Sequence, residues 1–141
     1  MSSLTGFVSL ADFFPPADSG ATSKAGLFVV KVRDLSPHCG GGCKEYPHLL
    51  REALCARLAE AAAEWLSEEA ACGANLIRPA FGYPSCPDHS LKAEAFRLLD
   101  ASKLGMALTS TYAMIPSTSI CGMLISHPEA KYITIRNYEG H

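Results

Sequence analysis

Three closely spaced prolines constrain the middle of this chain more than any other feature. Residues 77–89 read IRPAFGYPSCPDH. Each proline fixes its own φ, lacks an N–H donor and pushes the preceding residue toward extended geometry, so we predict a stiff loop rather than a helix or a central strand. Gly82 permits a tight turn, Arg78 offers a fork for a carboxylate or phosphate, and Tyr83 offers an aromatic face. The loop suits ligand binding; the equal alternative is a rigid surface connection whose Tyr83 packs on its neighbours.

Size and charge limit the classes of protein to consider. The chain has 141 residues, 48% of them hydrophobic and 18% charged, which predicts one domain over residues 1–141 with its own core. The net charge is −2 and lysine and arginine are scattered. This pattern lacks the basic footprint of a partner for nucleic acid or an anionic membrane, so we expect neither.

Two further features predict a cytoplasmic protein. No run approaches the roughly 18 apolar residues of a membrane span, and residues 1–14 lack the basic and apolar parts of a secretion signal. The six cysteines are therefore expected to remain reduced, as core thiols or loop residues.

One short stretch offers possible metal ligands. His38, Cys39, Cys43 and His48 lie close together around three consecutive glycines, and zinc prefers such nitrogen and sulfur ligands. However, zinc motifs usually need a second ligand pair at a defined distance, and the glycines are typical of a flexible connection. We favour a mobile loop without metal and keep a metal or thiol site as the alternative.

Two helices are predicted. Residues 44–71 are rich in strong helix formers, and apolar residues recur at steps of three and four, namely Leu50, Leu54, Leu58, Ala61, Ala62 and Trp65. On the other side, Arg57, Glu60 and Glu64 fit solvated ion pairs, with Glu60 as a cleft carboxylate for a cationic ligand as the alternative. A second helix starts at a cap by Asp88 or Ser90 and runs to about Leu99. Its expected buried stripe is Ala93, Phe96, Leu99 and Leu98.

Four segments are predicted as strands. Residues 25–32 form a β-branched run typical of a buried strand, and 106–114, 119–125 and 131–136 follow after Gly105. The connections between the last three are tight and marked by proline, which favours antiparallel pairing. We therefore predict an α+β fold, in which one long and one shorter helix pack on an antiparallel sheet.

Several stretches resemble one known family. Residues 78–89 are similar to the central motif of the S-adenosylmethionine-binding activation domain at the C-terminus of cobalamin (vitamin B12)-dependent methionine synthase. Further similar stretches follow in the same order: 9–13, 57–61, 105–106 with 108–109, 112–114 before Pro116, and 126–132. A collinear series of motifs over nearly the whole chain is more specific than a single motif. The chain resembles a shortened, free-standing form of the C-terminal part of that domain.

The resemblance implies a role in reactivation. In those synthases the cobalamin occasionally oxidises to inactive Co(II), and rescue needs one electron from a flavodoxin-type donor and a methyl group from S-adenosylmethionine. The activation domain presents that methyl group to the cobalamin of a partner domain or subunit, mainly by positioning and electrostatics. We therefore expect a component of a methyltransferase system and not a complete enzyme, because no cobalamin-ligand motif, folate site or homocysteine zinc site is recognisable.

The resemblance also assigns binding residues and no catalytic residue. Arg78 would hold the carboxylate of the methyl donor, while the Ala80 backbone and Tyr83 would line the cleft beside the donor and the corrin. Tyr132 and the backbone around Ile133 would meet the nucleoside end.

Glu60 matches an acidic residue near the cationic amino and sulfonium groups of the donor. For this residue the resemblance favours the binding role over the solvated helix face.

The chain also departs from the family pattern. An aspartate of the donor site lies in a longer N-terminal portion of the family domain, and Cys72 lies in a shortened link where the family carries an acidic residue. Ile115 replaces a tryptophan. Each lost charge-assisted contact is worth roughly 1.5 to 3 kcal/mol, so we expect weakened donor binding. The alternative function is a corrinoid-protein docking or regulatory module that has lost S-adenosylmethionine, and the shortened domain also makes a homo-oligomer an expectation.

Overall fold

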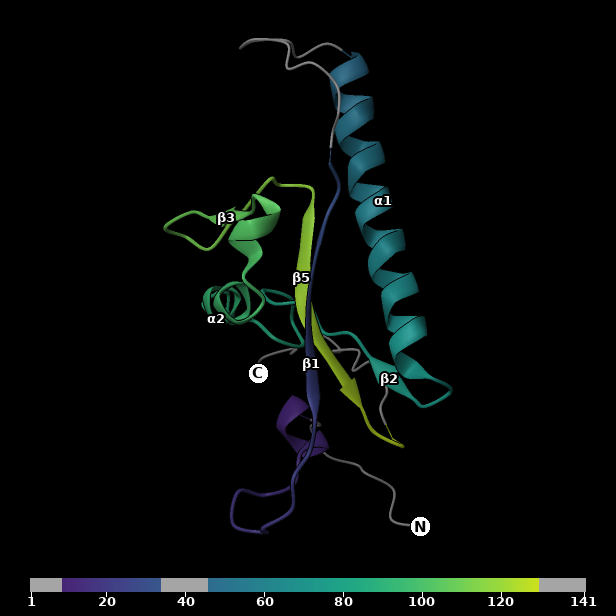
Figure 1. Cartoon of the computed structure of the whole chain (residues 1–141), viewed down its shortest axis with the longest axis vertical. Helices are drawn as coiled ribbons and strands as arrows, with labels where there is room; N and C mark the ends of the chain where they lie inside the picture. Colours follow the sequence, from purple (N-terminus) through teal and green to yellow (C-terminus); the bar gives the residue numbers. More distant parts are fainter. Residues whose placement is uncertain (1–8, 34–45, 130–141) are drawn as a thin grey trace, which may run out of the picture.

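The computed structural model describes residues 9–33 and 46–129 (Figure 1). Its strands pair only in antiparallel fashion within this part of the chain, and two α-helices pack on the sheet, which confirms the predicted α+β fold. None of the helices in these residues is long and apolar enough to cross a membrane. In chain order the elements are η1 (Leu10–Phe13), β1 (Ala25–Lys31), α1 (Tyr46–Ala71), β2 (Leu76–Ile77), α2 (Leu91–Leu98), η2 (Ala101–Leu104), β3 (Ala107–Leu108), β4 (Met114–Ile115) and β5 (Ser119–Ser126).

Strand β5 is the centre of the fold. It pairs with all of β1, from Ala25 opposite Ile125 to Lys31 opposite Ser119, and with β2 at its other edge. Helix α1 covers one side of this sheet and α2 the other (Figure 1). Because side chains alternate along a strand, β5 contributes to both sides. Its odd-numbered residues form the core under α2 and η1, where the buried residues are Phe13, Ile77, Phe81, Cys86, Ala95, Cys121 and Ile125.

Helix α1 begins and ends close to the predicted bounds, but its apolar stripe faces away from the sheet. Leu50, Leu54 and Trp65 have exposed fractions of 56%, 57% and 61%, and Leu58 is also exposed. The buried residues of the helix are the small ones, Cys55, Ala59 and Ala63. Small side chains let the helix backbone lie close to the sheet, so the larger leucines are turned outward. The prediction of the helix was correct and the face implied by its leucines was wrong.

Helix α2 also differs from its predicted stripe. Lys92 and Ala95 are buried and Phe96 is half-buried, whereas Ala93, Leu98 and Leu99 are exposed. Ser90 occupies the N-cap position without a side-chain cap bond. Instead, Asp88 Oδ1 accepts hydrogen bonds from the Ser90 amide and hydroxyl at 2.8 and 2.6 Å.

The strand predictions were partly correct. Residues 25–31 and 119–126 form β1 and β5, as expected. Residues 106–114 are not one strand, because Tyr112 has a φ of +61° and the chain reverses there into the β3–β4 hairpin. Strand β2 had not been predicted. The predicted strand 131–136 lies outside the described residues.

Candidate functional site

An open groove of about 870 Å³ runs along the loop of residues 78–89 where this loop lies beside β5. The predicted residues Arg78, Ala80, Tyr83 and Glu60 all line it, so residues from α1 and from the loop meet at one place. Tyr132 and Ile133 lie outside the described residues. The groove is lined by Glu60, residues 78–85, His89, Lys92, Met114, Ser117 and residues 119–121.

The base of the loop is fixed to β5 by backbone contacts. Ala80 forms a β-bridge with Gly122, and the Met123 amide donates to the Pro79 carbonyl at 2.9 Å. A Cβ at Gly122 would lie only 2.6 Å from the Pro79 carbonyl oxygen and 2.9 Å from Cε1 of Phe28. The loop therefore reaches its position because residue 122 has no side chain. An isolated glycine in an apolar β-run signals such a close approach, so this contact of residue 122 was predictable from the sequence.

The tip of the loop is a tight turn. The Gly82 amide donates to the Cys86 carbonyl and the Cys86 amide to the Tyr83 carbonyl, both at 2.8 Å. Gly82 has a φ of +88°, and a Cβ there would lie 2.2 Å from Cε1 of His89, so the histidine ring covers this glycine. Tyr83 is 65% exposed and does not pack into its surroundings. The turn thus holds an aromatic ring at the rim of the groove.

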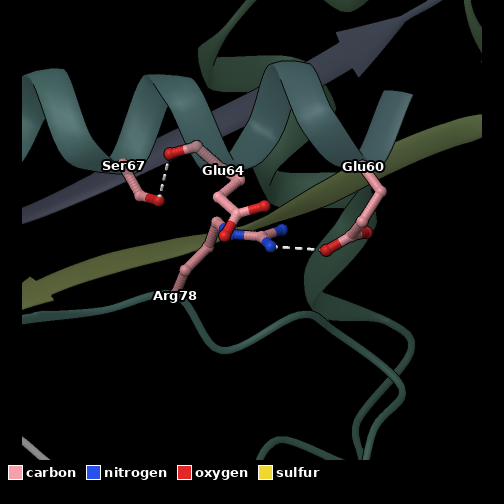
Figure 2. A network of polar contacts seen from close by, with 4 residues as sticks. All are labelled: Glu60, Glu64, Ser67 and Arg78. Carbon is pink, nitrogen blue, oxygen red and sulfur yellow. Dashed lines mark hydrogen bonds and ion pairs between the residues drawn. The ribbon is translucent and has the colours of Figure 1, made fainter. Parts of the chain in front are cut away.

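Arg78 is held in the groove wall by contacts from two elements. Its Nη2 donates to Oε1 of Glu60 at 2.5 Å, and its guanidinium carbon lies 5.7 Å from the centre of the Phe28 ring. The Arg78 side chain is 13% exposed and that of Glu60 is 51% exposed. Figure 2 shows the Glu64 side chain extending from the next turn of α1 toward the same guanidinium. The wall therefore combines the Arg78 cation with the Glu60 carboxylate, and the two residues come from the loop and from α1.

A second polar group lies on the α2 side of the groove. Lys92 is 6% exposed, and its Nζ lies 2.9 Å from Nδ1 of His89 and 3.3 Å from the Tyr112 carbonyl oxygen. Ser119 is equally buried. These residues could not be assigned a role from the sequence, because no local pattern distinguishes a buried lysine in a short helix from an exposed one.

Burial disfavours the thiolate form of two cysteines, Cys86 and Cys121. Burial, strengthened by the charge of Asp88, raises the pKa of Cys86. Burial also raises the pKa of Cys121 to about 11, although the charge of Lys92 acts in the opposite direction. The four cysteines within the described ranges, Cys55, Cys72, Cys86 and Cys121, are free. Thiolates, which are the reactive form, are therefore disfavoured beside the groove at neutral pH.

The alternative metal site is only partly covered by the structure. His38, Cys39 and Cys43 lie outside the described residues. His48 lies on α1 with its Nε2 3.9 Å from Oε1 of Glu52. Within residues 9–33 and 46–129, no group of three or more histidine, cysteine, aspartate and glutamate side chains is arranged to hold a metal ion.

Comparisons with known proteins agree with this architecture. A family model described as "Vitamin B12 dependent methionine synthase, activation domain" matches residues 3–75 and 75–140. A solved structure titled "Crystal Structure of the MetH Reactivation Domain bound to AdoHcy" is similar with a TM-score of 0.57 and 39% sequence identity. The match covers 62% of this chain and 33% of that one, so the matched part spans about a third of the relative's length.

Proposed function

Because this chain belongs to the family of activation domains of vitamin B12-dependent methionine synthases, we propose that it binds S-adenosylmethionine in the groove and presents the methyl group to a cobalamin. The cobalamin would be carried by a partner domain or subunit, and a flavodoxin-type reductant would supply the one electron that methylation of its cobalt requires. The role is reactivation of the synthase in the cytoplasm. The chain itself contributes binding and orientation.

The observation that carries this proposal is the fixed position of Arg78. Glu60 and the Phe28 ring hold the guanidinium in the groove wall, so little side-chain entropy remains to be lost when a ligand binds. A guanidinium has five N–H donors and can contact two carboxylates at once. Arg78 therefore suits the carboxylate of the methyl donor, in the same groove as the Ala80 backbone. The 39% identical relative is described as bound to AdoHcy, the product left when S-adenosylmethionine gives up its methyl group.

Glu60 and Tyr83 would contact the cationic groups of the donor and the corrin of the cofactor, respectively. The half-exposed carboxylate of Glu60 faces the groove, where it attracts the cationic sulfonium and amino groups of the donor. Tyr83 stands at the rim with 65% of its surface exposed, which suits contact with the flat corrin face of the incoming cofactor. Tyr132 and Ile133 are assigned to the nucleoside end through the family resemblance alone.

The second candidate is a docking or regulatory module that no longer binds the donor. It is favoured by the short contact between Arg78 and Glu60, because a carboxylate of the protein already neutralises the cation that the donor carboxylate needs. In this case the exposed loop tip would still contact a corrinoid protein.

Titration calorimetry with S-adenosylmethionine and with AdoHcy separates the two candidates. We expect Arg78→Ala to weaken binding of both ligands at least roughly tenfold, since a charge-assisted contact is lost. Glu60→Gln is expected to weaken the sulfonium compound more than AdoHcy, which lacks the positive sulfur. Arg97→Ala is the matched control, because Arg97 pairs with Glu94 on the exposed face of α2 and does not line the groove.

The titration is repeated in the presence of a cobalamin-loaded partner domain. If no heat is seen with either ligand, with or without that partner, donor binding is excluded and the docking module becomes the better account. Binding that Arg78→Ala leaves unchanged would instead exclude the role given to this arginine.

A further inference from the structure

Lys92 is a buried cation without an acidic partner among the residues that the structure describes. In the described part of the chain its Nζ contacts Nδ1 of His89 and the carbonyl oxygen of Tyr112, and neither contact is to a carboxylate. The two acidic residues of the same segment are engaged elsewhere: Asp88 accepts from Ser90, and Glu94 accepts from Arg97 at 2.5 and 2.9 Å. Burial of an uncompensated charge is costly.

The place of Lys92 in α2 adds to this cost. It is the second residue of the helix (Leu91–Leu98), and the N-terminal turn carries the positive end of the helix dipole, which disfavours a cation. Two independent effects therefore oppose a lysine at this position. A compensating interaction with an anion would explain why a lysine is tolerated there.

Ser119 supplies the second observation. Its hydroxyl is buried and has no hydrogen-bond partner within residues 9–33 and 46–129, which is also unfavourable. Ser119 and Cys121 lie on the same side of β5, two residues apart, and Cys121 packs in one core cluster with Ala95 of α2, the helix that carries Lys92. The hydroxyl and the ammonium therefore belong to one region of the groove, and both residues line it.

We propose that Lys92 and Ser119 form an oxyanion-binding subsite on the α2 side of the groove, for a carboxylate or phosphate group of a ligand. One anionic oxygen would accept from both the ammonium and the hydroxyl and so satisfy both. The neighbouring Met114 and Cys121 are apolar, and low polarity strengthens such a contact. The subsite is distinct from Arg78, which lies with Glu60 and Phe28 on the α1 side of the sheet. It does not depend on donor binding.

The direction in which Ser119→Ala changes the melting temperature tests the role proposed for Ser119. In the free protein, Ser119→Ala removes a hydroxyl without a partner, so the melting temperature is expected to stay constant or rise. If Ser119 has an ordinary structural role, the same change lowers the melting temperature, and the proposal is overturned. Ser110→Ala, at an exposed serine of the β3–β4 hairpin, is the control for a serine that does not line the groove.

Anion binding is followed on the lysine itself. Protein labelled with ¹³C at the lysine side chains is titrated with inorganic phosphate, and the Lys92 signal is identified by its loss in Lys92→Met. We expect this signal to move saturably, and Ser119→Ala to weaken the binding at least roughly tenfold. Lys103 is 81% exposed and pairs with Asp100, so its signal is the internal control. If the Lys92 and Lys103 signals move alike, or if Ser119→Ala leaves the phosphate affinity unchanged, the proposal fails.

Competition identifies the source of the anion. S-adenosylmethionine carries a carboxylate as its only anionic group, whereas cobalamin carries a phosphodiester. Displacement of phosphate from Lys92 by the first would place the donor carboxylate at Lys92 and so overturn its assignment to Arg78, whereas displacement by the second assigns the subsite to the corrinoid. Because phosphate alone is the primary probe, loss of this subsite would be distinguishable from a failure of donor binding at Arg78.

Discussion

The two sides of the sheet are built differently. On the α2 side, large side chains such as Phe81 and Ile125 fill a core, and the loop of residues 78–89 is pinned to β5 by backbone bonds. On the α1 side, the helix lies on the sheet through Ala59, Ala63 and Cys55, while its leucines are exposed. On the α1 side the buried Phe28 ring comes from the sheet, so the helix contributes only small side chains to that side, whereas on the α2 side large side chains come from the loop and from β5. The proposed donor site lies where the two meet, with Arg78 from the loop and Glu60 from α1.

Gly122→Ala is expected to have the largest effect, because it disturbs both sides at once. The new methyl group would collide with the Pro79 carbonyl oxygen and the Phe28 ring. Overpacking of this kind costs roughly 2 to 3 kcal/mol, measured as the free energy of unfolding in urea. Gly26→Ala in β1 is the matched control, since its Cβ would meet only the Leu124 side chain, at 3.1 Å. Equal losses for the two variants would contradict the close packing assigned to Gly122.

A pair of substitutions in α1 tests whether its small residues or its large ones hold it to the sheet. Ala59 is fully buried and Leu58 is 49% exposed. We expect Ala59→Leu to lower the free energy of unfolding by about 2 kcal/mol and Leu58→Ala to change it by less than about 0.5 kcal/mol. A large loss for Leu58→Ala would mean that this face is covered in solution. Sedimentation would then show whether a second copy covers it, as the expected homo-oligomer requires.

The pH dependence of stability tests burial on the α2 side. The folded pKa of Cys121 is about 11 and its ordinary value is 9.0, so the unfolded chain loses the thiol proton first. Stability from this group is therefore fully present below pH 9 and falls as the pH rises from 9 to 11. We expect Cys121→Ala to show a shallower decline over this window than the wild type. The comparison uses urea unfolding at each pH. Parallel profiles would show that Cys121 is not buried in solution.

Removal of the ion pair is expected to have the smallest effect on stability. The Glu60 side chain is half exposed, and exposed pairs contribute about 0.5 kcal/mol. Glu60→Gln should therefore lower the free energy of unfolding by about that amount at low salt, and the difference should vanish near 1 M salt. A loss that persists in salt would mean that the pair is shielded from solvent. In that case α1 and the loop depend on each other more than their exposure indicates.

The sequence predicted the positions of helices and strands better than it predicted which side of a helix packs on the sheet. Helix α1 was found because many strong helix formers follow one another, but the spacing of its leucines could not reveal that the sheet lies against Ala59 and Ala63. The hairpin at 106–114 was missed because its turn lacks the usual residues. Thr109 makes this turn by accepting the Ala113 amide at its Oγ1, 3.0 Å away, while Tyr112 takes the left-handed conformation.

The candidate site was predictable only in part, for a physical reason. The loop could be predicted from its prolines, because each proline restricts the backbone locally. The contact between Arg78 and Glu60 depends on how α1 crosses β5, and only the family resemblance brought these two residues into one site. The burial of Lys92 could not be predicted from the neighbouring sequence, because it follows from the packing of α2 on the sheet.

The pairing of β1 with β5 also determines when the groove can form during folding. Ala25 and Ile125 are opposite each other, although almost the whole described chain separates them in sequence. Closing so long a loop carries an entropic cost that must be met before the contact stabilises anything, and such contacts slow folding. During synthesis β1 leaves the ribosome long before its partner strand exists. A ligand for the groove can therefore stabilise only chains that have already completed this late step, and it cannot guide the earlier ones.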